Sequence, residues 1–115
     1  MAERTSLSVA HFRALRFRKL GEGVRYREVH LENLMLCYYE LEPGARHGGI
    51  AGEGRIIHVV EGDITGSTGG TAFAIGPGEV VLVESGAEFQ WHSGSRTRLI
   101  EARSRVVPED IIPID

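Results

Sequence analysis

Residues 43–62 read PGARHGGIAGEGRIIHVVEG, and the two halves of this segment differ in character. The second half, RIIHVVEG, is rich in β-branched residues that favour a strand, and it ends at a glycine turn. The first half contains the glycines Gly44, Gly48, Gly49, Gly52 and Gly54. Glycine fits places where a backbone takes an unusual conformation or passes close to another group. We therefore predict a loop that wraps around something, followed by a strand.

The composition is that of an ordinary globular protein. The chain has 115 residues, of which 42% are hydrophobic and 25% charged, values that suit one domain with its own core. The formal net charge of −3 gives no support for a nucleic-acid surface. A basic cluster at residues 11–20, HFRALRFRKL, alternates with apolar residues and fits a segment that lies across a barrel with its charges in water. We expect no nucleic-acid partner.

Cys37 is the only cysteine, which excludes an internal disulfide and a cysteine-based zinc site. A reducing, intracellular location is the natural interpretation. The N-terminal residues lack the apolar core of a signal peptide, and no stretch reaches the roughly eighteen apolar residues of a membrane span. We expect a cytoplasmic protein with no membrane partner.

From Val24 onward, short β-rich runs alternate with glycine-containing turns, a spacing typical of an all-β sandwich or barrel. The predicted strands cover residues 24–30, 34–42, 55–61, 63–68, 71–75, 80–84, 88–93 and 97–104. One short helical turn is expected within residues 8–14. The chain then divides into three parts: an N-terminal arm (1–23) packing on the barrel or on a partner subunit, a β-barrel (24–104) and a C-terminal tail (105–115).

Three segments in this order resemble a known signature: PGA at 43–45, VVEGDI at 59–64 and IGPGEVVLVESGAEFQWH at 75–92. They are similar to the two motifs of the cupin superfamily, and the chain most resembles its small, single-domain, RmlC-like members. The resemblance covers most of the chain, residues 24–104. It implies an all-β fold, the cupin-type antiparallel β-barrel or jelly roll.

In that family, three histidines and a glutamate of the two motifs hold a divalent metal inside the barrel. Laid on this sequence, the first two histidine positions fall at Ile50 and Gly52 and the glutamate position falls at Arg55. The last histidine position falls at Phe89. A shift by one residue offers carboxylates but no histidine. Because Arg55 would place a permanent positive charge beside a cation, we expect neither a metal nor another cofactor.

Strand alternation sorts the side chains into two faces once positions 55 and 89 are turned inward. The expected inward set is Cys37, Tyr39, Leu41, Ile57, Val59, Trp91, Leu99, Glu101 and Arg103, and the expected outward set is His58, Val60, Gln90 and His92. The interior is then a mostly apolar cup. His58 and His92 are interpreted as outer-face residues at a subunit contact or under the N-terminal segment.

Arg55 and Glu101 are the most informative pair, because a lone buried charge is very unfavourable. Two interpretations stay open. The pair is either a salt bridge in the vacated metal site or an anion anchor beside a carboxylate base, with Tyr39 adding a hydroxyl donor. Glu101, Arg55 and Tyr39 are therefore the catalytic candidates.

Candidates for substrate binding surround this pair. Phe89 and Trp91, two residues apart, form an aromatic wall that either fills the core or contacts a flat apolar ligand. His47 lies at the barrel mouth, where it either approaches a bound molecule or faces solvent. The complete substrate-binding set is His47, Ile50, Gly52, Ile57, Phe89, Trp91 and Cys37, and Cys37 is also read as a small core residue.

Three functions remain open. The first is a metal-independent isomerase, cyclase or lyase, in which Arg55 holds a negative oxygen and Glu101 moves a proton; the resemblance implies such activities for cupins without the metal histidines. The second is a non-catalytic module that binds or senses a small apolar, aromatic or anionic molecule. The third is a metal enzyme with atypical ligands from His47, Glu53, Glu101 and Tyr39. A Glu101 fully engaged by Arg55, with no cavity beside it, would count against the first.

A two-fold homodimer is the expected assembly. Cupin-like barrels commonly pair through edge strands, as the resemblance implies. Outward apolar residues of the predicted strand 55–61 and of residues 12–20 supply a contact surface.

Overall fold

The computed structural model describes residues 15–104 and 111–112, and every regular element within them is a β-strand. The strands are β1 (Arg18–Gly21), β2 (Val24–Leu31), β3 (Leu34–Leu41), β4 (Arg46–Ala51), β5 (Arg55–Glu61), β6 (Ile64–Thr68), β7 (Thr71–Ile75), β8 (Val80–Val83), β9 (Glu88–Ser93), β10 (Thr97–Ser104) and β11 (Ile111–Ile112). The predicted all-β fold class is confirmed. The helical turn expected within residues 8–14 lies outside the described residues. The described ranges contain no helix long and apolar enough to cross a membrane.

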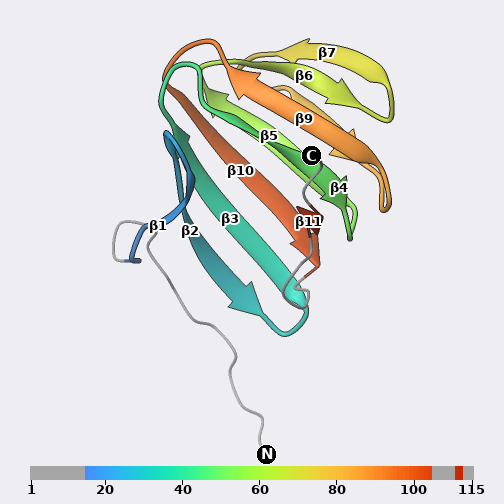
Figure 1. The fold of residues 1–115 in the computed structure, drawn as a ribbon. Helices are drawn as coiled ribbons and strands as arrows, with labels where there is room; N and C mark the ends of the chain where they lie inside the picture. The colour runs from blue at the N-terminus through green and yellow to red at the C-terminus, as the bar shows by residue number, and fades with distance from the viewer. Residues whose placement is uncertain (1–14, 105–110, 113–115) are drawn as a thin grey trace, which may run out of the picture.

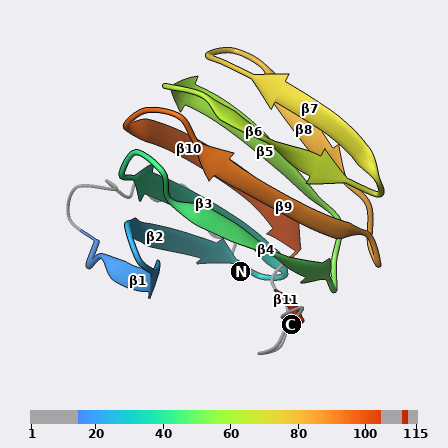
Figure 2. The ribbon, with the colours of Figure 1, turned by 45° about the horizontal axis from the view of Figure 1, so that its top comes forward.

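The strands form two antiparallel sheets that lie as separate layers (Figures 1 and 2). Sheet A has the strand order β1-β2-β3-β10-β5-β8, and sheet B has the order β11-β4-β9-β6-β7. Neighbours come from distant parts of the sequence, because β10 lies between β3 and β5 while β9 lies between β4 and β6. This interleaving of strands is the jelly-roll arrangement.

The predicted alternation of side chains is confirmed by their burial. Ile57, Val59, Phe89 and Trp91 are each at most 2% exposed and form the core between the sheets, together with the other residues of the cluster: Val24, Met35, Cys37, Tyr39, Leu41, Ala45, Ala51, Ile64, Val81, Val83 and Leu99. Residues of the predicted outward set are exposed, apart from the half-buried His58. The phase that the sequence assigned to these strands is therefore correct.

The glycine-rich segment is a strand, so the loop predicted there is wrong. β4 pairs with β9 from Arg46 opposite His92 to Ile50 opposite Glu88, and only residues 52–54 connect it to β5. At Gly48, an added Cβ would lie 2.6 Å from the backbone oxygen of Phe89. Glycine at this position allows the two strands to approach closely. A strand of this kind is as rich in glycine as a loop, so composition does not distinguish them.

Both chain ends contribute edge strands. β1 pairs with β2 at the edge of sheet A, and β11 pairs with the end of β4 at the edge of sheet B. Phe17, just before β1, lies between two arginine side chains, with the guanidinium carbons of Arg25 and Arg27 at 4.0 and 3.7 Å from its ring centre. The remainder of the expected arm and tail lies outside the described residues.

Candidate functional site

Three charged side chains meet on the inner face of sheet A. Glu101 Oε2 lies 3.2 Å from Arg55 Nη1 and 2.9 Å from Arg103 Nε. Arg55 also donates from Nε and Nη2 to the backbone oxygen of Glu53, at 3.2 and 3.0 Å. The side chains of Arg55, Glu101 and Arg103 are only 0%, 3% and 12% exposed. One carboxylate is thus held by two guanidiniums inside the fold.

This triad decides how Glu101 can act. A salt bridge with Arg55 was one of the two interpretations that the sequence left open, and Arg103 was placed on the same face. The structure adds Arg103 as a second partner of the carboxylate. Buried charges persist when partners of opposite sign and hydrogen bonds compensate for lost water. A proton taken up by Glu101 would have to displace these contacts. The geometry fits a structural ion cluster better than a free catalytic base.

His47 and Trp91 face the interior from sheet B, on adjacent strands and directly opposite each other. The His47 ring makes edge contacts with Trp91 and Phe89, at centroid distances of 5.4 and 5.8 Å. His47 Nε2 and Trp91 Nε1 are both buried, and neither has a hydrogen-bond partner among the described residues. Buried polar atoms are nearly always paired, so two neighbouring exceptions make this place a candidate binding site.

His47 is a half-buried strand residue rather than a loop residue at an open mouth. Burial, followed by the positive charges of Arg55 and Arg103, lowers the pKa of His47 from 6.5 to about 4. The imidazole is therefore neutral at pH 7. That both arginines affect this pKa indicates that the triad of sheet A and the ring pair of sheet B face the same part of the interior.

Tyr39 and Cys37 lie on the same inner face as Glu101. Burial, with the Glu101 charge as the second cause, raises the pKa of Tyr39 well above its usual value and raises that of Cys37 to about 12. Tyr39 stacks on Tyr26 with 5.5 Å between the ring centroids. Tyr39 therefore keeps its proton and can donate it in a hydrogen bond, whereas a protonated Cys37 thiol is a poor nucleophile.

The register of β4 corrects two predicted site residues. Phe89 pairs with Gly49, so Gly49 shares the inner face, and the following residue, Ile50, pairs with the exposed Glu88 on the outer face. Gly52 is exposed in the connection after β4. Ile50 and Gly52 therefore do not line the barrel. The error is one residue of register, and one residue moves a side chain to the opposite face of a sheet.

The corrected register gives the family's ligand positions as Gly49, Ala51, Arg55 and Phe89, and these residues do not fit a metal. None offers an imidazole, thiolate or carboxylate, and the guanidinium of Arg55 repels cations. Within the described ranges, no three His, Cys, Asp or Glu side chains gather closely enough to hold a metal ion. The atypical set of His47, Glu53, Glu101 and Tyr39 is not such a group either.

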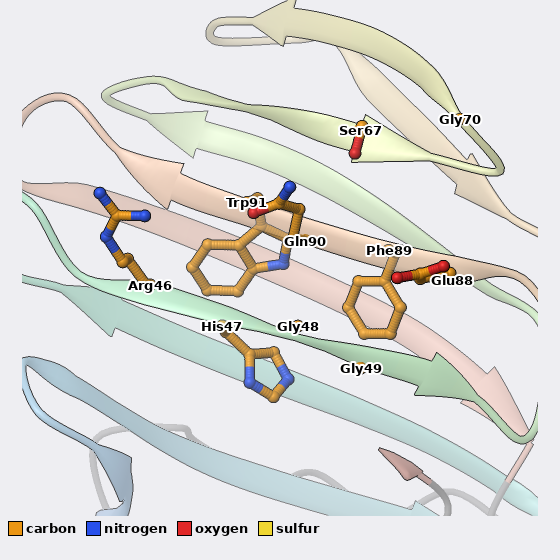
Figure 3. Close-up of a pocket in the computed structure, with 10 residues that line it drawn as sticks. All are labelled: Arg46, His47, Gly48, Gly49, Ser67, Gly70, Glu88, Phe89, Gln90 and Trp91. Atoms are coloured by element: carbon orange, nitrogen blue, oxygen red, sulfur yellow. The ribbon is translucent and has the colours of Figure 1, made fainter. Parts of the chain in front are cut away.

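An open cavity between the sheets was also expected, bordered by the glycine-rich segment. Three cavities lined by described residues have volumes of about 720, 450 and 400 Å³, and none of them is lined by Arg55, Glu101 or Tyr39. The cavity that does border β4, of about 720 Å³, is also lined by outward residues such as Gln90 and Ser67 (Figure 3). Ile57 and Cys37 are enclosed in the core, at 1% and 0% exposed. None of these three cavities is lined by Glu101 itself, although the cavity of about 450 Å³ is lined by its partner Arg103.

Two polar residues of the inner face were missed. Glu28 pairs with Cys37, and His30 pairs with Met35, so both project inward from β2. His30 Nε2 lies 3.1 Å from Glu28 Oε1, and their side chains are 33% and 18% exposed. Arg18 Nη1 lies 3.6 Å from the same Glu28 oxygen. Glu28 and His30 are two residues apart on β2 and therefore share a face. Pairing β2 with the strand of the inward Cys37 would have predicted that this face is the inner one.

The arrangement of the strands agrees with that of solved cupins. An RmlC-like cupin from Shewanella frigidimarina superposes with a TM-score of 0.81 at 16% identity, over 92% of this chain and 97% of its own. The chain has the cupin fold. A polyketide cyclase, RemF from Streptomyces resistomycificus, gives a TM-score of 0.75 at 17% identity, over 90% of this chain and 82% of its own.

A cupin-superfamily sugar phosphate isomerase from Silicibacter pomeroyi gives a TM-score of 0.72 at 13% identity, over 86% of this chain and 76% of its own. No protein-family model and no curated protein matches the sequence. At these identities the likeness concerns the cupin fold alone. The function has to be argued from the residues.

Proposed function

We propose that this cupin is a non-catalytic module that binds a small carboxylate anion between its two sheets. The observation that carries the proposal is the pair of unpartnered, buried ring nitrogens, His47 Nε2 and Trp91 Nε1. The indole N–H can only donate a hydrogen bond, so its missing partner is an acceptor. A carboxylate oxygen is such an acceptor, and charge strengthens the bond.

Electrostatics support an anion at this place. Arg55 and Arg103 act on His47 across the interior, and both contact Glu101. Two guanidinium groups therefore lie near the ring pair. Guanidinium groups should bind an anion more strongly than a neutral molecule of the same shape, because the interior of a protein screens charge less than water does.

The size of the ligand follows from the packing. Phe89 and Trp91 are both 2% exposed, and none of the cavities of 400–720 Å³ is lined by Arg55 or Glu101. A flat aromatic substrate has no described space beside Glu101, whereas a molecule of acetate size needs little more than the room of a few waters. The partly exposed Glu28 and His30 indicate that solvent reaches the inner face from the side of β2.

The test uses acetate as the probe and acetamide as its neutral analogue. Trp91 is the only tryptophan, so the fluorescence of the protein and the NMR shift of the indole N–H report on this one ring. We expect a saturable shift of both signals with acetate and none with acetamide.

The variant Trp91→Phe keeps an aromatic ring but removes the hydrogen-bond donor. It should weaken acetate binding, as measured by calorimetry, about tenfold or more. Tyr38→Phe, whose hydroxyl group donates to Glu40 on the outer face, serves as the control. Equal signals from acetate and acetamide, or equal affinity in Trp91→Phe, would refute the proposal.

Acid–base catalysis is kept as a second candidate because of one observation, the contact between Glu28 and His30 at 3.1 Å on the partly exposed inner edge. A histidine next to a carboxylate is a common general-base arrangement. This version of the function replaces Glu101 by His30 as the proton carrier. Turnover of a bound molecule that is lost in His30→Gln while binding persists would favour it.

We also propose that the outer face of sheet A binds a second copy of the chain. One row of apolar side chains crosses this face, with Leu82, Ile56, Ala102, Leu36 and Val29 adjacent on five neighbouring strands. Leu82, Ile56 and Leu36 are exposed in the single chain. An apolar row complements itself when two copies meet across a two-fold axis. A contiguous exposed patch of this kind usually marks an interface.

A further inference from the structure

The cavity of about 720 Å³ borders sheet B, and its lining combines outer-face residues such as Gln90 and Glu88 with His47 and Trp91 of the inner face. Its outer-face side chains come from three neighbouring cross-strand rows. Gln90 lies between Gly48 and Ser67, Glu88 lies beside Ile50 in the row on one side, and Arg46 lies beside His92 in the row on the other side. Gln90 and Glu88 are exposed. Its volume is in the range of small-molecule sites. We refer to this cavity as the outer trough.

The floor of the outer trough is backbone rather than side chain. Gly48 carries no side chain above the sheet, and a Cβ there would collide with the backbone of Phe89 and Gln90. His47, Phe89 and Trp91 also belong to the lining, and Phe89 and Trp91 are each only 2% exposed. Rings that are this buried offer little surface on which sugars or bases could stack.

Opposite charges stand at the two ends of the outer trough (Figure 3). Arg46 pairs with His92, and Glu88 lies four residues before His92 on β9, so the two charges are separated by about 13 Å along the strand. Neither Arg46 nor Glu88 makes an ion pair with another described residue within 4 Å, as the other surface arginines Arg25 and Arg96 do. The Gln90 amide and the Ser67 hydroxyl group lie between them and can both donate and accept hydrogen bonds.

We propose that the outer trough binds an extended zwitterion, a short peptide with free ends, whose carboxylate meets Arg46 and whose ammonium group meets Glu88. A tripeptide spans about 10 Å and the charged side chains bridge the rest. Its amide groups lie over Gln90 and Ser67, and the flat glycine floor admits its backbone. His47 and Trp91 line this cavity as well as the carboxylate site between the sheets. Arg46 and Glu88 have no part in the carboxylate site, so variants at these two positions test this proposal separately.

The experiment uses trialanine as the probe, with its N-acetyl and C-amide forms as matched ligands, and measures affinity by calorimetry or NMR titration. We expect Arg46→Gln to weaken binding of free trialanine about fivefold, the size of one exposed ion pair. The same substitution should leave the affinity of the C-amide form unchanged, because that ligand has no carboxylate. Glu88→Gln should show the converse pattern, with the N-acetyl form unaffected.

Arg98→Gln is the control, since Arg98 is an exposed arginine on sheet A, paired with Glu61 at 3.6 Å. It should change none of the affinities. All three substitutions are at exposed positions, so unfolding is not expected, and thermal melting checks this. The proposal is overturned if Arg46→Gln weakens the acid and amide forms equally, if trialanine binds no better than its doubly blocked form, or if trialanine does not bind at millimolar concentration.

Discussion

Arg55 changes the chemistry of the barrel centre at a single position. It stands where the family pattern has a metal-binding glutamate, and its guanidinium is buried beside Glu101. A negative ligand position has become a positive one, and a guanidinium group at this position repels cations. Arg103, on the neighbouring strand β10, adds a second guanidinium group beside Glu101.

His47 couples the stability of the fold to pH. Its pKa is lowered to about 4 by burial and by the facing arginines, whereas a histidine in the unfolded chain has a pKa near 6.5. Between these values the unfolded chain binds a proton that the folded chain does not bind. The free energy of unfolding should therefore fall as the pH drops from 6.5 to about 4, by up to roughly 3 kcal/mol from this residue.

The measurement is urea denaturation at several pH values, compared between the wild type and His47→Gln. Other groups titrate in the same window, so the difference between the two proteins isolates the contribution of His47. The variant should lose less stability on acidification. Parallel pH profiles would show that His47 is solvated in the folded state.

Among the elements, β4 shows most clearly where sequence reasoning stopped. The strands with alternating β-branched residues, such as RIIHVV of β5, were predicted within a residue or two because their pattern has period two. β4, with the sequence RHGGIA, has no such pattern. It is a strand because β9 lies beside it, and pairing with a distant segment leaves no local signal.

The same limit applies to the site. Arg55, Glu101 and Trp91 were assigned correctly to the inner face, since their strands have a clear phase. Ile50 was assigned wrongly because the phase of β4 rested on counting residues through glycines. The contact of Glu101 with Arg103 and the missing partners of His47 and Trp91 depend on distances between strands, which alternation does not supply.

The close approach of β4 to β9 makes Gly48 sensitive to substitution. Gly48→Ala would place a Cβ 2.6 Å from the Phe89 backbone oxygen, and we expect a loss of about 1–3 kcal/mol in the free energy of unfolding as the strands move apart. Gly21→Ala, at the end of β1, meets nothing within 4 Å and should change stability by no more than about 0.5 kcal/mol. Chemical denaturation of both variants makes the comparison, and equal stabilities would show that the strands separate without strain.

At the scale of the whole molecule, the apolar row on sheet A leads to a prediction about assembly. Ile56→Glu combined with Leu82→Glu places two charges in the middle of the proposed interface. Light scattering after size-exclusion chromatography should give a dimer for the wild type and a monomer for this variant, because unpaired charges are costly to bury. Gln90→Glu, on the opposite face of the molecule, is the control and should remain dimeric. A wild type that is monomeric at every concentration would contradict the proposed interface.

The sequence by itself determined the all-β class, the faces of the alternating strands and the lack of metal-binding side chains at the family's ligand positions. These properties depend on residue type and on short periodic patterns, which act locally. Only the tertiary structure decided that the glycine-rich segment is a strand, that Arg103 joins Arg55 on Glu101, and that the buried ring nitrogens of His47 and Trp91 have no hydrogen-bond partner among the described residues. Each of these is a relation between strands that are adjacent in space and distant along the chain, and the jelly-roll topology alone brings them together.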